Sequence, residues 1–243
     1  MTRSMTFLFA FLTGLAGTIL GTAWGLPLLL VVIALVVIGT MRLDSQLMGP
    51  VHTKVRDGFA LTYDDGPDPE STPPLLDLLA ERGAKATFFL IGDKARAHPE
   101  IVKRLVDEGH EIANHSQSHR PMLNFRLRGG MRREIGACQE TLANVAGLRP
   151  RYYRPPCGLT NPFVTLAAHD LGMSVVGWNV RSLDTVRPDA AQHVCKRLDN
   201  GSIVLLHDGG LPADRVVALS RSILDKADER GLRPQTLTPE TLA

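Results

Sequence analysis

The chain has 243 residues, enough for one sizeable domain with a small appendage. Its formal net charge is only +2, so the composition gives no sign of a nucleic-acid partner. Its three cysteines, Cys138, Cys157 and Cys195, are odd in number and widely spaced, which indicates neither a disulfide framework nor a cysteine-based zinc site.

The amino-terminal end is apolar. Between Arg3 and Arg42 lie 38 residues without a charged side chain. As one straight helix they would be about 57 Å long, far beyond a hydrocarbon core of roughly 30 Å. A break at residues 21–27, which hold two glycines and a proline, divides the run. We therefore expect residues 1–42 to be a membrane segment, with two short transmembrane helices at about residues 5–22 and 26–41.

The side of the membrane follows from the flanking charges. A hairpin would leave these basic residues on one side, which the positive-inside rule assigns to the cytoplasm: Arg3, Arg42, Lys54 and Arg56. The alternative is a signal peptide with an apolar core at residues 7–20, which places the rest of the chain outside. We favour the hairpin because a signal peptide leaves apolar residues 28–38 unexplained. The prediction is anchoring in the inner (cytoplasmic) membrane, with the following domain on the cytoplasmic side.

Residues 43–56 lack clear periodicity and are predicted to be a linker, followed by the main domain at residues 57–243. Short apolar and β-branched runs predict strands at about residues 59–61, 87–91, 111–114, 174–180 and 203–206. Amphipathic runs between them predict helices at about residues 72–83, 99–109, 131–145, 162–172, 188–198 and 213–230. This alternation predicts an α/β fold of parallel units packed around one core.

Polar side chains follow the predicted strands at the point where each strand ends: Asp64, Asp65, His115, His119, Arg154, Asp184 and His207. In a β/α barrel this edge is where active sites are built. Asp64 and Asp65 are adjacent and would point to opposite sides, so we expect one to bind a metal ion and the other to transfer a proton. Taken alone, their segment fits an ordinary Asp-Gly turn equally well.

His115 and His119 stand four residues apart, which on one helical turn puts both rings on the same side. Such a pair alone is more often a surface coincidence than a ligand pair. With Asp65 it becomes a two-histidine, one-carboxylate set that leaves positions open for water and substrate. The predicted cofactor is a divalent metal, Zn by default, with Co, Mn or Ni as the other candidates.

Four segments, in this order, resemble the motifs of the polysaccharide deacetylase family, carbohydrate esterase family 4. Residues 62–67 resemble Thr-Phe-Asp-Asp-Gly-Pro with Tyr63 for Phe, and residues 115–119 resemble His-Ser/Thr-x-x-His. Residues 154–158 resemble Arg-Pro-Pro-Tyr-Gly with Cys157 for Tyr, and residues 205–208 read Leu-Leu-His-Asp. The resemblance covers roughly residues 55 to 210. It implies an irregular (β/α) barrel with fewer than eight units.

The resemblance also implies roles. Asp64 would be the general base, held by Arg154, and His207 the general acid that protonates the leaving amine. Asp184 would orient His207. The backbone N–H of Cys157 would donate to the oxyanion, and Leu205 would form an apolar wall for the acyl methyl group.

One segment departs from the family pattern. Where an Asp-x-x-Asp-Trp-like motif is usual, this chain has Trp178, Arg181 and Asp184, with no tryptophan after the aspartate. We interpret this difference, together with Cys157, as a sign of a different substrate, with Trp178 among the substrate-binding residues. Farther along the surface, an arginine-rich segment at residues 120–133 is either a solvated face or a clamp for an anionic group that includes Arg126 and Arg128.

The resulting prediction is a metal-dependent hydrolase that removes an N-acetyl or N-formyl group from an amino sugar in a membrane-associated glycan or lipid-linked sugar. One alternative is an extracytoplasmic N-deacetylase of peptidoglycan or exopolysaccharide. Another is a non-catalytic membrane adaptor that keeps the fold. No obligate protein partner is evident from the sequence.

Overall fold

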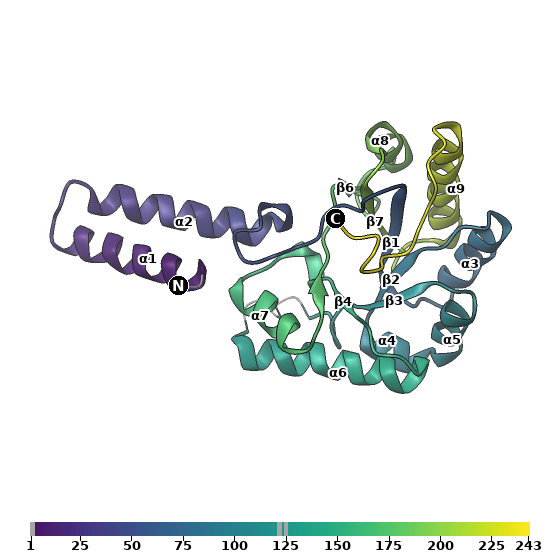
Figure 1. Cartoon of the computed structure of the whole chain (residues 1–243), viewed down its shortest axis with the longest axis horizontal. Helices are drawn as coiled ribbons and strands as arrows, with labels where there is room; N and C mark the ends of the chain where they lie inside the picture. Colours follow the sequence, from purple (N-terminus) through teal and green to yellow (C-terminus); the bar gives the residue numbers. More distant parts are fainter. Residues whose placement is uncertain (1–2, 121–122, 124–125) are drawn as a thin grey trace.

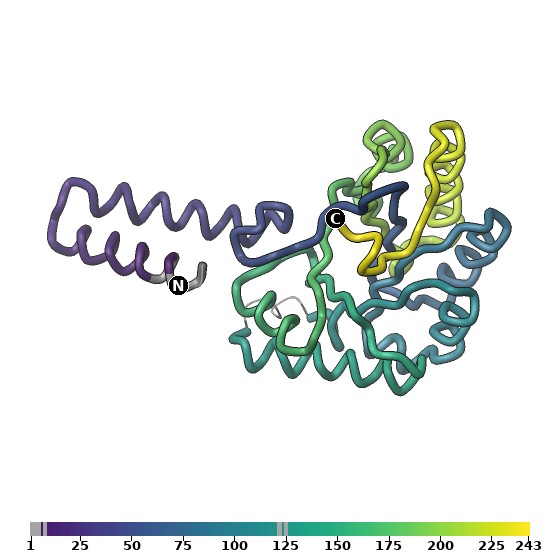
Figure 2. Tube along the Cα trace, viewed as in Figure 1, coloured from purple at the N-terminus to yellow at the C-terminus, as the bar shows by residue number. Residues whose placement is uncertain are grey.

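The computed structural model describes residues 3–120, 123 and 126–243, with the side chains of residues 3–5, 7 and 8 excepted. A helical hairpin projects from a rounded α/β body, as the ribbon and the chain trace both show (Figures 1 and 2). The predicted α/β fold is confirmed, because strands and helices alternate along the body.

One parallel sheet forms the centre of the body. Its seven strands are β1 (Phe59–Gly66), β2 (Thr87–Leu90), β3 (Glu111–Asn114), β4 (Tyr152–Tyr153), β5 (Ser174–Val175), β6 (Val180–Arg181) and β7 (Ser202–His207). Their order across the sheet is β5-β4-β3-β2-β1-β7-β6, and neighbouring strands are parallel.

The sheet curls into an incomplete barrel. Strands β5 and β6 lie at opposite edges, yet only residues 176–179 separate them in sequence. That link can span at most about 18 Å, so the two edges must approach each other. The expected irregular barrel with fewer than eight units is therefore confirmed, whereas the single strand predicted at residues 174–180 is wrong. The chain leaves one edge at Val175 and joins the other at Val180.

Helices pack on the outside of this sheet (Figure 1). They are α3 (Thr72–Glu81), α4 (Gly92–Ala97), α5 (Pro99–Asp107), α6 (Arg128–Ala146), α7 (Pro162–Asp170), α8 (Ala190–Arg197) and α9 (Ala213–Glu229). All but the short α4 follow the predictions to within a few residues. Helix α7 begins as its sequence indicates, because the Asn161 side chain accepts hydrogen bonds from the N–H groups of Phe163 and Val164.

Strand β1 has a helix-facing side and an interior side. Phe59, Leu61 and Tyr63 belong to the main apolar cluster beneath the helices, where Tyr63 stacks on Phe88. By alternation, Thr62 and Asp64 face the barrel interior. The strand therefore delivers a carboxylate into the barrel at its carboxyl end.

The amino-terminal hairpin consists of α1 (Arg3–Ile19) and α2 (Gly25–Met41). The two helices approach closely where Gly17 meets Gly25, since a Cβ atom on Gly25 would overlap the backbone of Gly17. Each helix has 17 residues, or about 25 Å. Among the described residues, no helix combines the length and the apolar character needed to cross a membrane. The two predicted helices form, but the prediction that they are transmembrane helices is not supported.

Residues 43–56, predicted to be a linker, pack against the body. His52 forms a β-bridge with Val176, and Lys54 forms one with Ser202. This segment therefore connects the residue that follows β5 with the first residue of β7.

Candidate active site

The end of β1 carries two adjacent carboxylates with different backbone conformations. Asp64 continues the strand alternation and is only 4% exposed. Asp65 has a left-handed backbone with φ of 72°, a conformation that aspartate tolerates better than most residues. The pairing of β1 with β2 also shifts register between Asp64 and Gly66. This local irregularity turns Asp65 into the same cavity that Asp64 enters, so that Asp64 Oδ2 and Asp65 Oδ1 lie 3.8 Å and 3.5 Å from His115 Nε2. The expectation that the two side chains point to opposite sides is therefore wrong.

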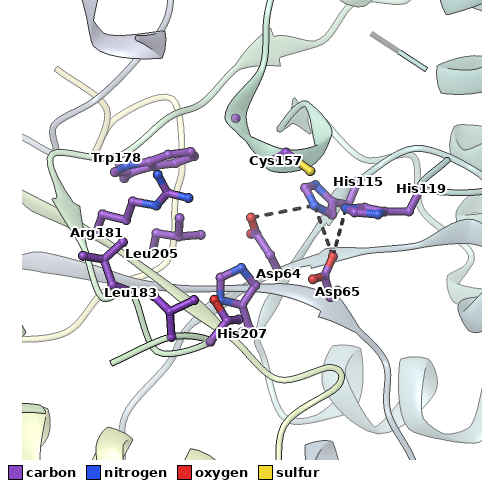
Figure 3. Close-up of a pocket in the computed structure, with 13 residues that line it drawn as sticks. Asp64, Asp65, His115, His119, Cys157, Trp178, Arg181, Leu183, Leu205 and His207 are labelled. Atoms are coloured by element: carbon purple, nitrogen blue, oxygen red, sulfur yellow. Dashed lines mark ion pairs between the residues drawn. The ribbon is translucent and has the colours of Figure 1, made fainter. Parts of the chain in front are cut away.

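Asp65, His115 and His119 form a compact cluster. The Asp65 Oδ1 atom lies 3.2 Å from His119 Nε2 and 3.5 Å from His115 Nε2 (Figure 3). One potential ligand atom from each residue lies within 4.8 Å of the other two. Residues 115–119 do not form the expected helical turn. Ser116 and His119 have positive φ values, so a bent loop brings the two rings together.

This cluster fits a divalent metal ion. Asp65 Oδ1 is buried and has no hydrogen-bond partner among the described residues. His115 Nδ1 lies 2.9 Å from the Arg154 carbonyl oxygen, which leaves Nε2 directed at the cluster, as metal-binding histidines are usually held. Burial by itself would raise the pKa of Asp65, but the two imidazoles hold it below its usual range. The donor set matches that of zinc sites with open positions.

Arg154 fixes Asp64 from inside the barrel. Its guanidinium is fully buried and donates to Asp64 Oδ1 at 2.7 Å, to Thr62 Oγ1 at 2.9 Å and to the Gly177 carbonyl at 2.8 Å. Burial lowers the pKa of Arg154, and the Asp64 carboxylate opposes that effect. A buried charge is stable only when it is paired and hydrogen-bonded, so this network holds Asp64 in one orientation.

Asp184 fixes His207 on the neighbouring strand. Its Oδ1 lies 2.7 Å from His207 Nδ1, and its Oδ2 accepts from the His207 backbone N–H at 2.9 Å. Burial lowers the pKa of His207, but the hydrogen bond and charge of Asp184 outweigh it and raise the pKa to about 9. Because β1 and β7 pair with Asp64 opposite His207, a carboxylate and an imidazole stand side by side.

Asp64, His207 and the triad line one cavity of about 230 Å³ (Figure 3). Its wall includes Asp64, Asp65, His115, His119, His207, Cys157, Gly158, Trp178, Arg181, Leu183, Thr185, Val186 and Leu205. Three of the predicted substrate-binding residues, Cys157, Trp178 and Leu205, line this cavity.

The arginines predicted to clamp an anion lie elsewhere. Arg128 is 2.5 Å from Asp170 in an ion pair, and Arg126 lies 3.9 Å from Glu134. Neither arginine lines the cavity.

Asp208 is a buried residue to which the sequence assigned no role. Its carboxylate accepts a hydrogen bond from Thr72 at 2.6 Å, and its backbone N–H donates to the Asp64 carbonyl at 3.1 Å. Burial raises the pKa of Asp208 to about 7. The residue lies against Gly66, so it helps to hold the turn that carries Asp64 and Asp65. Its position directly after His207 is the sequence feature that could have identified Asp208 as part of the site.

Cys157 also lines the cavity. It occupies a short turn, Pro156–Gly158, with φ of 59°, and burial raises the pKa of its thiol. The next residue, Gly158, has no side chain and touches the Trp178 ring. The turn and the tryptophan together form one wall of the cavity.

The fold and the site define a class of protein. It is an incomplete (β/α) barrel whose carboxyl edge holds a carboxylate, an imidazole and a potential metal-binding triad in one cavity, a combination of groups typical of hydrolases. A polysaccharide deacetylase family model matches residues 52–176. The chain belongs to this family, whose members are hydrolases acting on N-acetyl amide bonds.

Two individual relatives are also deacetylases. The chain is 36% identical to a peptidoglycan-N-acetylglucosamine deacetylase of Bacillus cereus over 195 residues, 74% of this chain and 86% of the relative. It is also 36% identical to a chitooligosaccharide deacetylase of Sinorhizobium fredii over 169 residues, 68% of this chain and 78% of the relative.

Two solved structures share the fold. A family 4 carbohydrate esterase from Streptomyces lividans, in complex with acetate, superposes with a TM-score of 0.69 at 33% identity, covering 78% of this chain and 97% of that one. A family 4 pseudoenzyme from Bacillus anthracis superposes with a TM-score of 0.68 at 26% identity, covering 78% and 66%.

Proposed function

We propose that the protein is a metal-dependent N-deacetylase that removes the acetyl group from an amino sugar of a polysaccharide. The observation that carries this proposal is the meeting of three units in one cavity: the Asp64–Arg154 pair, the Asp184–His207 pair and the triad of Asp65, His115 and His119. Relatives that act on N-acetylglucosamine in peptidoglycan and on chitooligosaccharide support a glycan substrate over a lipid-linked sugar.

A divalent ion bound by the triad would supply a Lewis acid that polarises the acetyl carbonyl. Asp64 acts as the base. Arg154 occupies its Oδ1, so Oδ2 is the atom that accepts a proton from the attacking water, and it points toward the triad, 3.8 Å from His115 Nε2. The Arg154 network keeps this carboxylate from rotating away.

His207 acts as the acid. Its Nδ1 is held by Asp184, so Nε2 donates the proton to the nitrogen of the departing amino sugar. The elevated pKa of His207 keeps the imidazole protonated at neutral pH, as a proton donor requires. Leu205, on the same strand as His207, supports the cavity as an apolar wall beside the acetyl methyl group.

The test is acetate release from an N-acetylglucosamine oligomer, combined with metal analysis of the purified full chain. We expect about one divalent ion per chain, loss of activity with a chelator, and recovery on adding zinc. His119→Ala should lose both the ion and the activity, whereas His193→Ala, on the surface of α8, should keep both. Full activity in the His119→Ala variant would refute the metal assignment.

The non-catalytic alternative has one observation in its favour, since a pseudoenzyme shares this fold. That alternative predicts no acetate release from the wild-type chain with any metal, even though the protein is folded. The same assay therefore separates the two functions.

We further propose that the α1–α2 hairpin anchors the protein on the inner membrane by entering it from one face without crossing. The hairpin carries no charged residue from position 4 to 41 and exposes large apolar side chains, among them Leu26, Leu30 and Val31. The basic residues that follow the hairpin favour the cytoplasmic face.

This localisation has its own test. Leu30→Asp combined with Val31→Asp should abolish flotation with phosphatidylethanolamine–phosphatidylglycerol vesicles. A control variant, Leu127→Asp, changes an exposed leucine of the body and should float like wild type. Equal flotation of all three proteins would refute the anchor, and a phosphatase reporter after residue 243 would reveal the side.

A further inference from the structure

The cavity contains a cationic side chain that the proposed reaction does not use. Arg181 is the last residue of β6 and pairs with Leu205 of β7 across the sheet. Its side chain is exposed and lines the cavity, and its guanidinium carbon lies 5.8 Å from the centre of the Trp178 ring. Figure 3 shows the guanidinium beside that ring and directed toward the side of the cavity where Asp64 lies.

Arg181 has no carboxylate partner among the described residues. Two other arginines described above are paired: Arg154 with Asp64, and Arg128 with Asp170. The contact with Trp178 holds the guanidinium in place through the ring face, and such contacts leave the N–H donors of an arginine available to a ligand.

The acidic residues of the cavity already have partners. Asp64 is paired with Arg154, and Asp184, behind the cavity wall, is paired with His207. Asp65 belongs to the triad that the proposed function assigns to a metal ion. The positive charge of Arg181 is therefore not consumed by the catalytic groups and remains available to a substrate.

We propose that Arg181 makes the enzyme select substrates with an anionic group, a carboxylate or a phosphate, on the acetylated sugar or on the sugar next to it. This inference rests on the proposed N-deacetylase function. Guanidinium groups bind both kinds of anion through two parallel hydrogen bonds. Arg181 and Leu205 are neighbours on adjacent strands, about 4.8 Å apart in the sheet, so the anion lies close to the acetyl group. Arg181 thus takes the anion-binding role first predicted for Arg126 and Arg128.

The test compares three kinds of N-acetylated substrate at one fixed ionic strength: a neutral N-acetylglucosamine oligomer, an oligomer containing N-acetylmuramic acid together with its methyl ester, and a phosphorylated oligomer. Arg181→Gln should lower kcat/KM for the carboxylate or phosphate substrate by about tenfold to a hundredfold, the loss expected for a hydrogen bond to a charged group. It should lower turnover of the neutral oligomer and the methyl ester much less, so that the preference for the anionic substrate falls. The loss should appear mainly in KM, because Arg181 binds a group away from the reacting atoms.

Two further variants sharpen the result. Arg181→Lys keeps the charge but not the planar pair of donors, so its loss should be intermediate. Arg128→Gln, which removes an arginine outside the cavity, should behave like wild type on every substrate. Thermal unfolding of each variant would show whether the contact with Trp178 is needed for folding, and Arg181→Lys carries the comparison if Arg181→Gln is unstable.

Equal losses on neutral and anionic substrates, or no loss on either, would overturn the role of Arg181 while leaving the deacetylase function intact. If the wild type releases no acetate from any substrate, the proposed function fails instead. Calorimetric binding of the N-acetylmuramic acid oligomer and its methyl ester then decides the role of Arg181 without turnover. Weaker binding of the acid alone in Arg181→Gln supports the role, and unchanged binding overturns it.

Discussion

Replacing Asp184 with asparagine would keep the shape of the group beside His207 and remove its charge. The asparagine oxygen can still accept from the His207 backbone N–H, as Asp184 Oδ2 does at 2.9 Å. Its NH₂ group then faces Nδ1, which can accept a hydrogen bond only when the imidazole is neutral. The variant should therefore disfavour the protonated ring that the reaction needs.

The size of the effect follows from the pKa of His207, which is raised from 6.5 to about 9. This change corresponds to roughly 3 kcal/mol of stabilisation of the imidazolium ion. Because the pKa is higher in the folded state, this stabilisation is fully present below about pH 6.5 and is lost as the pH rises through about 9. We expect Asp184→Asn to lower the pKa of His207 by about 2 pH units.

The assay is an NMR titration of the histidine rings in the metal-free protein, with His207 assigned from its missing signal in His207→Ala. In the active enzyme, the alkaline limb of the kcat/KM profile of Asp184→Asn should lie at lower pH than that of the wild type, because the pKa of His207 is lower. Asp189→Asn, which changes an exposed aspartate paired with Arg187, should leave both measurements unchanged. A His207 pKa that is the same in Asp184→Asn and wild type would refute the reasoning.

Three other changes have defined outcomes. Asp64→Asn should retain bound metal and the fold but lose about a hundredfold or more in kcat, and near-native turnover would mean that another residue is the base. Gly66→Ala would push a methyl group into a buried carboxylate and should cost about 1–3 kcal/mol of unfolding free energy, whereas Gly129→Ala, in an open helical position, should not lower the melting temperature. Tyr63→Phe removes a 2.8 Å hydrogen bond to Ser220 and should cost about 1 kcal/mol by chemical denaturation without changing activity, since Tyr63 faces the helices.

Much of the architecture could be predicted because hydrophobic periodicity is local. The helices that begin at Pro99 and Pro162 and the strand at Glu111–Asn114 each have their patterns and their boundary residues within one short window. Residues 174–180 show where this reasoning fails. Their apolar run reads as one strand, but closure of the barrel sends its two ends to opposite edges, and closure is a property of the whole sheet.

The site also contains features that the sequence predicted and features that it did not. The strand-end rule brought Asp64, Asp65, Arg154 and His207 together correctly, because parallel strands share one carboxyl edge. The helical turn expected at His115 was wrong, since left-handed residues set the geometry there. Which arginine lines the cavity also could not be predicted from the sequence. Arg128 follows the metal motif along the chain but pairs with Asp170, whereas Arg181 reaches the cavity because the chain crosses from one edge of the barrel to the other.

The adjacency of β1 and β7 has a consequence for how this protein is made. Asp64 and His207 lie side by side, yet β7 is the last of the seven strands of this sheet to be synthesised. Until then β1 keeps one open edge, and its residues from Phe59 to Asp64 are all buried in the finished protein. An open apolar edge is prone to pair with other chains, so the nascent domain should depend on chaperones until synthesis passes His207. Recovery of acetate release after dilution from denaturant would then report the closing of this long-range pair, a slow step for contacts so distant in sequence.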